Sequence, residues 1–232
     1  MRAWWHSALR VRYDALFVAN GTPPARATFE ALRARCAEVI ALDGGLRVLR
    51  RWQEPPRHII GDLDSVTPAD LLWAKRHRVR IHRRPSQESS DIEKGLAFCR
   101  ARGMKHVLIA GVEGDRLDHV LNTLSACVEI KGIGITLVTR QSLILRLSGR
   151  AKCELEVPKT HTISWLGYPE ARGCRLSGVA WPVANGILKL GGRASFSNLA
   201  REERVSAAQT SGVSLLIIGL RPEAGKRLLF SR

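Results

Sequence analysis

The sequence predicts an α/β fold in the N-terminal part of the chain and an all-β fold in the C-terminal part. Along the first two thirds of the 232 residues, short apolar segments alternate with helix-like segments, which is typical of a mainly parallel sheet with helices on both faces. From about Gln141, short strand-like segments are separated by Gly, Pro and Ser, and no long helical period occurs. We therefore expect a Rossmann-like domain over residues 1–140 and a small β-sandwich domain over residues 141–232.

Six strands are expected in the first domain, each followed by a turn or a polar loop. The first ends at an Asn-Gly turn, and the third runs into the sequence IIGDLDS. Because these strands alternate with helices, a ligand is expected beyond their carboxyl ends. In chain order, the expected strands are residues 14–21, 38–42, 57–65, 78–82, 105–111 and 133–139.

Five helices are expected between these strands. Phe29, Leu32 and Cys36 share one face of the first helix, and Pro24 stands near its start, where a proline does least harm. Thr67 is the predicted N-cap of the third helix. The fourth begins with acidic residues and ends at a glycine, as the helix dipole and C-cap preferences favour. The expected helices are residues 24–36, 46–52, 68–77, 90–103 and 117–130.

The second domain is expected to contain strands only. Its apolar segments are short, and turn-forming residues stand between them. The expected strands are residues 142–148, 153–158, 161–167, 186–190 and 212–220.

A formal net charge of +16 is the strongest feature of the composition. Nucleic acid, an acidic membrane surface or a polyanionic small molecule could each bind so basic a chain. The excess is mostly arginine and is spread along the chain, which also suits solvated helix faces that have no partner. The composition alone leaves these interpretations open.

The sequence also indicates in which cellular compartment the protein is expected. The five cysteines are scattered, odd in number and without a C-x-x-C pair, which favours a reducing compartment over a disulfide framework or a zinc site. The N-terminal segment MRAWWHSALRVRYD lacks the continuous apolar region of a signal peptide. No apolar segment approaches the roughly 20 residues that span a bilayer. We therefore expect a cytoplasmic protein with no membrane partner.

Acidic residues gather where the expected strands end. Asp43 follows the second strand, Asp62 and Asp64 follow the third, and Asp91 begins a helix. Carboxylates at one edge of a sheet repel each other, and Mg²⁺ relieves that repulsion while it bridges protein oxygens to substrate phosphates. If residues 62–64 continue the strand, Asp62 and Asp64 point to the same side. The sequence therefore predicts a Mg²⁺ and phosphate site at this edge.

Glycines occupy the same strand-to-helix turns. Backbone N–H groups at Gly44, Gly45 and Gly111 can approach phosphate oxygens, and Arg116 can bind a phosphate through two of its N–H groups. Each feature also has a simpler role, since Asp-Gly-Gly commonly forms a turn and Asp91 is at a helix start. The combination of acids, glycines and Arg116 at the same strand ends is what favours a phosphate site.

The order of these motifs resembles that of the thiamine pyrophosphokinase family. An Asn-Gly turn, then DGG, then IIGDLDS follow the first three expected strands. QESSDIEKGL and GVEGDRLDHVLNTL come next, and GVAWPVAN and a late Ser-Asn match elements of the family's β domain. The resemblance covers nearly the whole chain. Two departures are Asp115, where many members have glycine, and Leu199, where an acid is frequent.

The resemblance implies transfer of a diphosphate from ATP to the hydroxyethyl oxygen of thiamine, giving thiamine diphosphate and AMP. It implies Mg²⁺ as the metal, with Asp62, Asp64 and Asp91 as ligands, and Asp43 as a fourth catalytic residue that supports the metal or orients the alcohol. The residues implied to bind ATP and its phosphates are Asn20, Gly44, Gly45, Gln87, Ser90, Gly111, Arg116, Asp118 and Asn122.

In the second domain, the resemblance implies that Trp181 stacks on the pyrimidine of thiamine, with Asn185, Ser197 and Asn198 nearby. In the family this tryptophan reaches the other subunit, which implies a homodimer with the active site across the interface. The alternative for Trp181 is a buried structural role in the β domain.

Two other functions compete with this interpretation. The first keeps the fold and the diphosphate transfer but uses another hydroxymethyl acceptor, such as a pterin. The second is a basic nucleic-acid-binding protein, whose affinity would depend steeply on salt. The basic clusters are not interleaved with aromatic residues, as a single-strand-binding surface requires, so nucleic acid is the less favoured partner.

Overall fold

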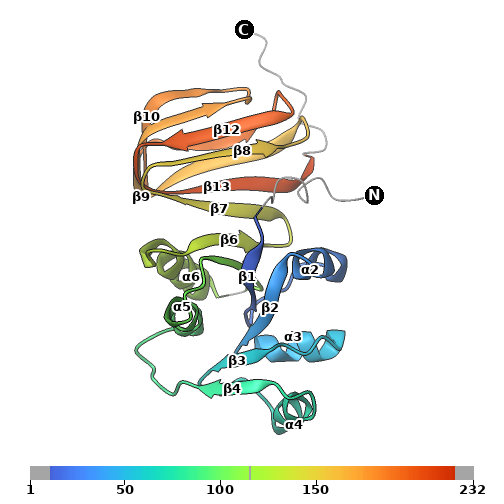
Figure 1. The fold of residues 1–232 in the computed structure, drawn as a ribbon. Helices are drawn as coiled ribbons and strands as arrows, with labels where there is room; N and C mark the ends of the chain where they lie inside the picture. The colour runs from blue at the N-terminus through green and yellow to red at the C-terminus, as the bar shows by residue number, and fades with distance from the viewer. Residues whose placement is uncertain (1–10, 115, 223–232) are drawn as a thin grey trace. The chain divides into compact units, whose positions relative to one another are not determined.

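The computed structural model describes residues 11–114 and 116–222, and the chain divides into two compact units between Arg140 and Gln141. Helices and strands alternate in the first unit, whereas the described residues of the second unit form strands only (Figure 1). The predicted α/β fold is therefore confirmed.

The first unit is built on six parallel strands in the order β4-β3-β2-β1-β5-β6. From β1 the chain builds outward to β4 and then crosses to the other side of β1 for β5, so the strand order reverses between β1 and β5. Ligands of open α/β sheets bind beyond the carboxyl ends of the strands at such a point. The strands are β1 (Tyr13–Val18), β2 (Cys36–Leu42), β3 (His58–Gly61), β4 (Arg80–Arg83), β5 (His106–Ala110) and β6 (Gly134–Val138).

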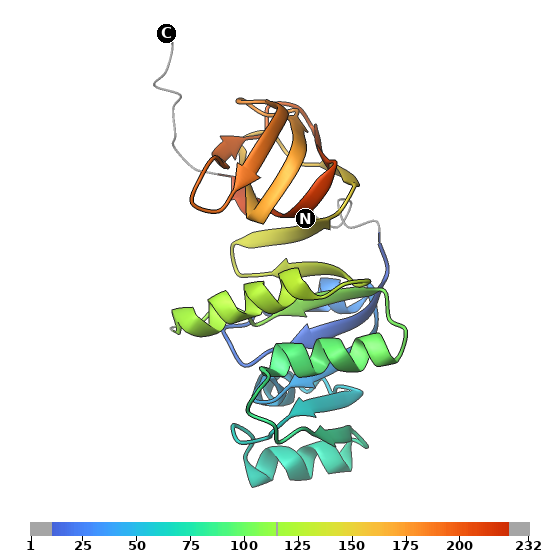
Figure 2. The same ribbon diagram turned by 90° about the vertical axis from the view of Figure 1, so that its left-hand side faces the viewer.

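Helices cover both faces of this sheet. Figure 1 shows α2 and α3 on one face, and Figure 2 shows α5 and α6 in front of the other. The central strands are therefore buried on both sides, which explains their continuous apolar sequences. The helices are α2 (Arg26–Arg33), α3 (Gly45–Trp52), α4 (Pro68–Arg76), α5 (Asp91–Ala101) and α6 (Leu117–Glu129).

Reciprocal caps begin two of these helices. The Thr67 hydroxyl accepts a hydrogen bond from the Asp70 N–H, and the Asp70 carboxylate accepts one from the Thr67 N–H, so the predicted N-cap is confirmed. Ser90 and Glu93 form the same arrangement at the start of α5. This cap fixes the position at which Asp91 enters the helix.

Two expectations for the first unit are wrong in detail. β3 ends at Gly61, so residues 62–64 do not continue the strand. Leu63 has a φ of 69°, in the left-handed region, which turns the chain between the two flanking aspartates. Cys36 is the first residue of β2 and not the end of a helix, because α2 ends at Arg33.

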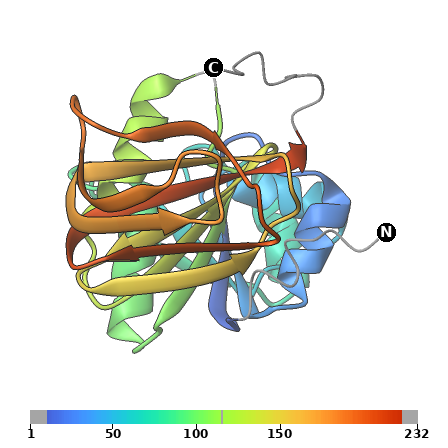
Figure 3. The ribbon, with the colours of Figure 1, turned by 90° about the horizontal axis from the view of Figure 1, so that it is seen from above.

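The described residues of the second unit form seven strands, and each pairs with its neighbours in antiparallel fashion. Five of them lie in the order β7-β13-β9-β12-β8, and β10 and β11 also pair with β9. Figure 3 shows these strands running side by side. They are β7 (Ser142–Ser148), β8 (Ala151–Glu156), β9 (His161–Ser177), β10 (Val183–Lys189), β11 (Ser195–Leu199), β12 (Arg204–Gln209) and β13 (Ser211–Pro222).

Trp165 lies at the centre of the apolar core of the second unit. Its side chain is fully buried, and its indole N–H donates to the Ser214 hydroxyl at 2.8 Å. Ser214 in turn donates to Oε1 of Gln209 at 2.5 Å. The indole nitrogen, which is the polar atom of the Trp165 side chain, therefore has the hydrogen-bond partner that a buried polar group needs. Within the described parts of the chain, no helix is both long and apolar enough to cross a membrane.

A buried polar cluster lies near the amino ends of β2, β3 and β4. Nδ1 of His58 is 2.9 Å from Nε2 of His82, and Nε2 of His58 is 3.6 Å from Oε1 of Glu38. His58 is fully buried and Glu38 is 7% exposed. Burial first, and then the positive groups His82, Arg102, Arg80 and Arg57, lower the pKa of His58 to about 4.

We expect this histidine to make the folded state sensitive to mild acid. The unfolded chain binds a proton at His58 near pH 6.5, whereas the folded chain does so only near pH 4, so stability is complete above pH 6.5 and falls as the pH falls toward 4. The expected loss of unfolding free energy between pH 7 and pH 4.5 is about 2 kcal/mol. Urea unfolding at both pH values measures it. His58→Gln should flatten the dependence, and exposed His119→Gln should not; equal dependence in both variants would contradict the assignment.

Candidate active site

Three aspartates meet beyond the carboxyl ends of β2 and β3. Asp43 follows β2, and Asp62 and Asp64 follow β3. One carboxylate oxygen from each lies within 4.8 Å of the others. The Asp43 N–H donates to the Ile60 carbonyl, which ties the end of β2 to the end of β3. We call Asp43, Asp62 and Asp64 the carboxylate cluster.

The turn at Leu63 brings Asp62 and Asp64 together. The Asp64 N–H donates to Oδ1 of Asp62 at 3.3 Å, which closes a local turn of the kind that Asp favours. The left-handed conformation of Leu63 therefore brings Asp62 and Asp64 to the same site. The alternation of side chains along an extended strand does not, because β3 ends at Gly61. The predicted juxtaposition of these two side chains is present, but its predicted cause is wrong.

The fourth predicted aspartate, Asp91, stands beside the carboxylate cluster at the start of α5. Gly61 permits the approach: a Cβ at that position would lie 2.9 Å from Cβ of Asp43 and 3.2 Å from Oδ1 of Asp91. Burial raises the pKa of Asp91, Lys94 opposes the rise, and the negative charges of Asp43 and Asp62 add to it. The geometry thus groups Asp43 with Asp62 and Asp64 most closely, and it places Asp91 next to them.

Lys94, which the sequence analysis did not single out, lies against these acids. Its side chain is 6% exposed, and Nζ is 3.2 Å from Oδ1 of Asp91 and 3.6 Å from Oδ2 of Asp62. The spacing of three residues between Asp91 and Lys94 on one helix was the signal available in the sequence, since such residues share a face. Lys94 supplies positive charge that partly offsets the repulsion among the carboxylates.

Gln87 is brought to the site as predicted from the resemblance. Its Nε2 donates to Oδ2 of Asp62 at 3.0 Å. Burial alone raises the pKa of Asp62, but hydrogen bonds from the Asp64 N–H and Gln87, together with Lys94, outweigh it and hold that pKa below its ordinary value. Asp62 is therefore ionised over the neutral range and available as an oxygen ligand.

The donor set fits a hard divalent cation. Mg²⁺ prefers carboxylate oxygens and usually retains positions for water or phosphate. Asp43 is 2% exposed, and its Oδ1 has no hydrogen-bond partner among residues 11–114 and 116–222. A buried carboxylate oxygen without a partner carries an energetic cost that a cation would remove. The carboxylate cluster therefore satisfies the chemistry of a Mg²⁺ site.

At the predicted glycines, other atoms leave no space for a side chain. A Cβ on Gly45 would collide with the Val18 carbonyl, one on Gly44 with the Asn20 side chain, and one on Gly111 would lie 2.6 Å from the Ala19 carbonyl. Gly111 also has a φ of 76°. The ends of β1, β2 and β5 thus pack closely at the point where the strand order reverses.

Arg116, Asp118 and Asn122 are exposed and lie at the start of α6 or within it. Arg116 forms a two-point ion pair with Asp118, with Nε 3.2 Å from Oδ1 and Nη2 2.5 Å from Oδ2. In the part of the chain that the structure describes, no hydrogen bond or ion pair joins these three side chains to the carboxylate cluster. Ser90, predicted to bind phosphate, uses its hydroxyl in the helix cap.

In the second unit, one of the residues predicted to bind thiamine, Asn198, contacts Trp181. Trp181 is 53% exposed, whereas Asn198 is 2% exposed. The Asn198 amide accepts from the Trp181 N–H at 3.1 Å and donates to the Trp181 carbonyl at 2.7 Å. Asn198 therefore positions the tryptophan backbone, and the alternative of a buried structural Trp181 is wrong. Asn185 and Ser197 are exposed and have left-handed φ angles of 51° and 50°.

The chain is similar to known proteins along most of its length. A family model described as thiamin pyrophosphokinase, catalytic domain, matches residues 29–138. Thiamine pyrophosphokinase 1 of Arabidopsis thaliana is 27% identical over 183 residues, which cover 73% of this chain and 67% of that one. Thiamine pyrophosphokinase 2 of the same plant is 26% identical, and the match covers 67% of this chain and 62% of the plant protein.

Solved structures share the fold. Thiamine pyrophosphokinase from Bacillus subtilis superimposes with a TM-score of 0.75 at 20% identity, covering 88% of this chain and 98% of that one. Thiamin pyrophosphokinase from Candida albicans gives a TM-score of 0.78 at 15% identity, covering 90% of each chain. The catalytic-domain match spans β2 to β6 and contains the carboxylate cluster. Together with the motif order, these findings make the chain similar to thiamine pyrophosphokinases in the sequence of residues 29–138 and in fold.

Proposed function

We propose that this protein transfers the diphosphate of ATP to the hydroxyl of thiamine, giving thiamine diphosphate and AMP. The observation that carries the proposal is the carboxylate cluster, whose oxygens lie within 4.8 Å of one another beyond the ends of β2 and β3. The names of the relatives point to the same reaction. The Mg²⁺ ligands in this proposal are Asp43, Asp62 and Asp64, with Asp91 adjacent.

The reaction needs positioning and charge neutralisation more than covalent catalysis. A bond forms between the hydroxyethyl oxygen of thiamine and the β-phosphorus, and the bond from that phosphorus to the oxygen of the α-phosphate breaks. Bound Mg²⁺ supplies the positive charge that lets the triphosphate approach the acids. Lys94 adds a cation beside Asp62 and Asp91, and Gln87 holds Asp62 in place.

The second unit provides the thiamine site in this proposal. Trp181 presents an exposed aromatic face for the pyrimidine, and Asn198 fixes the backbone that carries it. Asn185 and Ser197 offer polar groups on the same unit. We further propose, from the family resemblance, that this unit is a β-sandwich and that it mediates a homodimer whose active site lies across the interface.

Product analysis tests the reaction. The protein is incubated with ATP, Mg²⁺ and thiamine, and the products are separated by chromatography. We expect AMP and thiamine diphosphate in equal amounts, and neither product when EDTA replaces Mg²⁺. Formation of ADP and thiamine monophosphate, or of no thiamine product by a folded protein that binds ATP, would overturn the proposal; the second result would direct the search to other alcohols.

Trp181→Ala should weaken thiamine binding without changing the chemistry. Loss of an aromatic stacking surface is expected to raise the thiamine KM about tenfold and to leave the ATP KM unchanged. Steady-state kinetics with each substrate varied in turn give both constants. Phe196→Ala is the control, because Phe196 is a 73% exposed aromatic of the same unit. An unchanged thiamine KM in Trp181→Ala would remove Trp181 from the site.

A further inference from the structure

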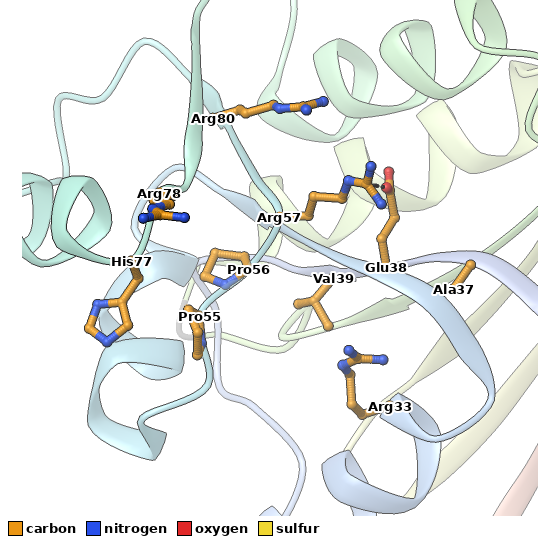
Figure 4. A pocket seen from close by; sticks show the side chains of 10 residues that line it. All are labelled: Arg33, Ala37, Glu38, Val39, Pro55, Pro56, Arg57, His77, Arg78 and Arg80. Carbon is orange, nitrogen blue, oxygen red and sulfur yellow. Dashed lines mark ion pairs between the residues drawn. The ribbon is translucent and has the colours of Figure 1, made fainter.

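The first unit also contains a pocket. It lies at the edge of the sheet opposite to the edge that carries the carboxylate cluster. It has a volume of about 410 Å³ and is bordered by the segments that lead into β2, β3 and β4 (Figure 4). Glu38 lies in β2 on the pocket side, and Asp43 of the cluster follows the end of β2 five residues later, which corresponds to about 16 Å along a strand. The pocket is therefore separate from the site of the proposed reaction.

Arginines dominate the lining. Arg33, Arg57, Arg78 and Arg80 come from different segments of the chain and border one cavity. Arg33 is paired with Glu54 at 3.3 Å, and Arg57 with Glu38 at 3.4 Å. Within the described residues, the guanidinium groups of Arg78 and Arg80 have neither an ion pair nor a hydrogen bond. The pocket thus holds two positive charges that no protein carboxylate neutralises.

The backbone around the pocket is fixed by hydrogen bonds. The Arg57 N–H donates to the Val39 carbonyl at 2.8 Å, and the Arg80 N–H donates to the Arg57 carbonyl at 3.1 Å. Glu38 is 7% exposed; its Oε2 pairs with Arg57, and its Oε1 lies 3.6 Å from Nε2 of His58. Figure 4 shows Arg57 beside Glu38, with Arg80 extending toward the same side. The backbone that carries Arg57 and Arg80 is therefore held in place by the neighbouring strand segments.

We propose that this pocket binds a phosphorylated small molecule through its phosphate groups. Guanidinium groups match phosphate oxygens in charge and in two-point geometry, and two arginines of this lining have no carboxylate partner among the described residues. The volume is in the range of small-molecule sites. Pro55, Pro56 and Val39 supply an apolar wall for the remainder of the ligand.

Inorganic pyrophosphate is the probe, titrated calorimetrically into the full chain in EDTA. Without a divalent cation the carboxylate cluster repels this anion, so binding reports the arginine pocket. We expect one site per chain, with the affinity unchanged in Asp62→Asn. Binding that requires Mg²⁺ or changes in Asp62→Asn would overturn the proposal, as would no binding at millimolar pyrophosphate. Because the readout is binding without Mg²⁺ or thiamine, its failure is distinct from failure of the diphosphate transfer.

The variant Arg78→Gly separates ligand binding from folding. Arg78 follows α4 with a φ of 57°, a conformation that favours glycine, so this change should leave the thermal midpoint unchanged or raise it. We expect at least a tenfold loss of pyrophosphate affinity. Gln53→Gly makes the same backbone change after α3, where φ is 54°, and Arg51→Ala removes an exposed arginine that does not line the pocket. Neither control should alter the affinity.

Two outcomes would refute the assignment to this pocket. Equal losses in Arg78→Gly and Arg51→Ala would mean that the net positive charge alone attracts the anion. Displacement of pyrophosphate by a short single-stranded oligonucleotide, with a steep dependence on salt, would assign the arginines to a nucleic-acid surface instead.

Discussion

Asp62→Asn should lower kcat for thiamine diphosphate formation by about 10²–10³, with little change in the thiamine KM. Asp62 is the cluster member with the most contacts: it accepts from the Asp64 N–H and Gln87, and it lies 3.6 Å from Lys94. Asparagine keeps the shape of the side chain but removes one negative charge from the proposed Mg²⁺ site. Initial rates at saturating ATP, Mg²⁺ and thiamine measure the effect.

Folding of this variant should be unimpaired, because the change relieves repulsion among neighbouring carboxylates. Asp70→Asn is the matched control. Asp70 is 3% exposed, caps α4 and pairs with Arg50 at 2.8 Å, so its substitution should cost about 1–3 kcal/mol of unfolding free energy while the folded fraction keeps its kcat. The assignment would fail if Asp62→Asn retained normal kcat, or if it lost activity only in proportion to lost folding.

The carboxylates of this site could be predicted from the sequence, but the buried side chain of Lys94 beside them could not. Acidic residues after successive parallel strands must meet at one edge of the sheet, so Asp43 and Asp62 could be grouped from the sequence. A lysine in the second turn of a helix, by contrast, is usually solvated. Lys94 is buried because α5 packs over the end of β3, and that packing depends on contacts between segments about 30 residues apart. Local sequence patterns contain no measure of such contacts.

Contacts between segments that are distant in the sequence also explain the errors in the second unit. A strand was predicted at residues 161–167, whereas β9 continues to Ser177. Pro169 and Gly173 read locally as turn residues. In the structure β9 pairs with β13, β10, β11 and β12, and this pairing carries the strand past both positions, although Gly173 has a left-handed φ of 61° and the register shifts nearby. Helix periods and caps are local and were mostly predictable, while strand length here is decided by partners distant in the sequence.

Gly45→Ala should destabilise the first unit by about 3 kcal/mol or more, which is the largest stability effect that we expect from a single methyl group. Gly45 is the first residue of α3, and a Cβ there would collide with the carbonyl oxygen of Val18 in β1. Alanine favours a helix over glycine by about 1 kcal/mol, so any loss must come from the collision. The backbone at Val18 and at position 45 cannot relieve this collision unless α3 moves away from the sheet.

Gly44→Ala separates this backbone collision from a side-chain collision at the adjacent position. Its Cβ would meet the side chain of Asn20, which is exposed, accepts a hydrogen bond from Arg47 at 3.1 Å, and can rotate away. We expect a loss of about 1 kcal/mol or less. Urea unfolding gives both free energies, and hydrogen exchange of the β1 and β2 amides assigns the change to the first unit. Equal, small losses would show that the Asp-Gly-Gly turn adjusts freely, so that close packing of α3 on β1 does not require glycine at position 45.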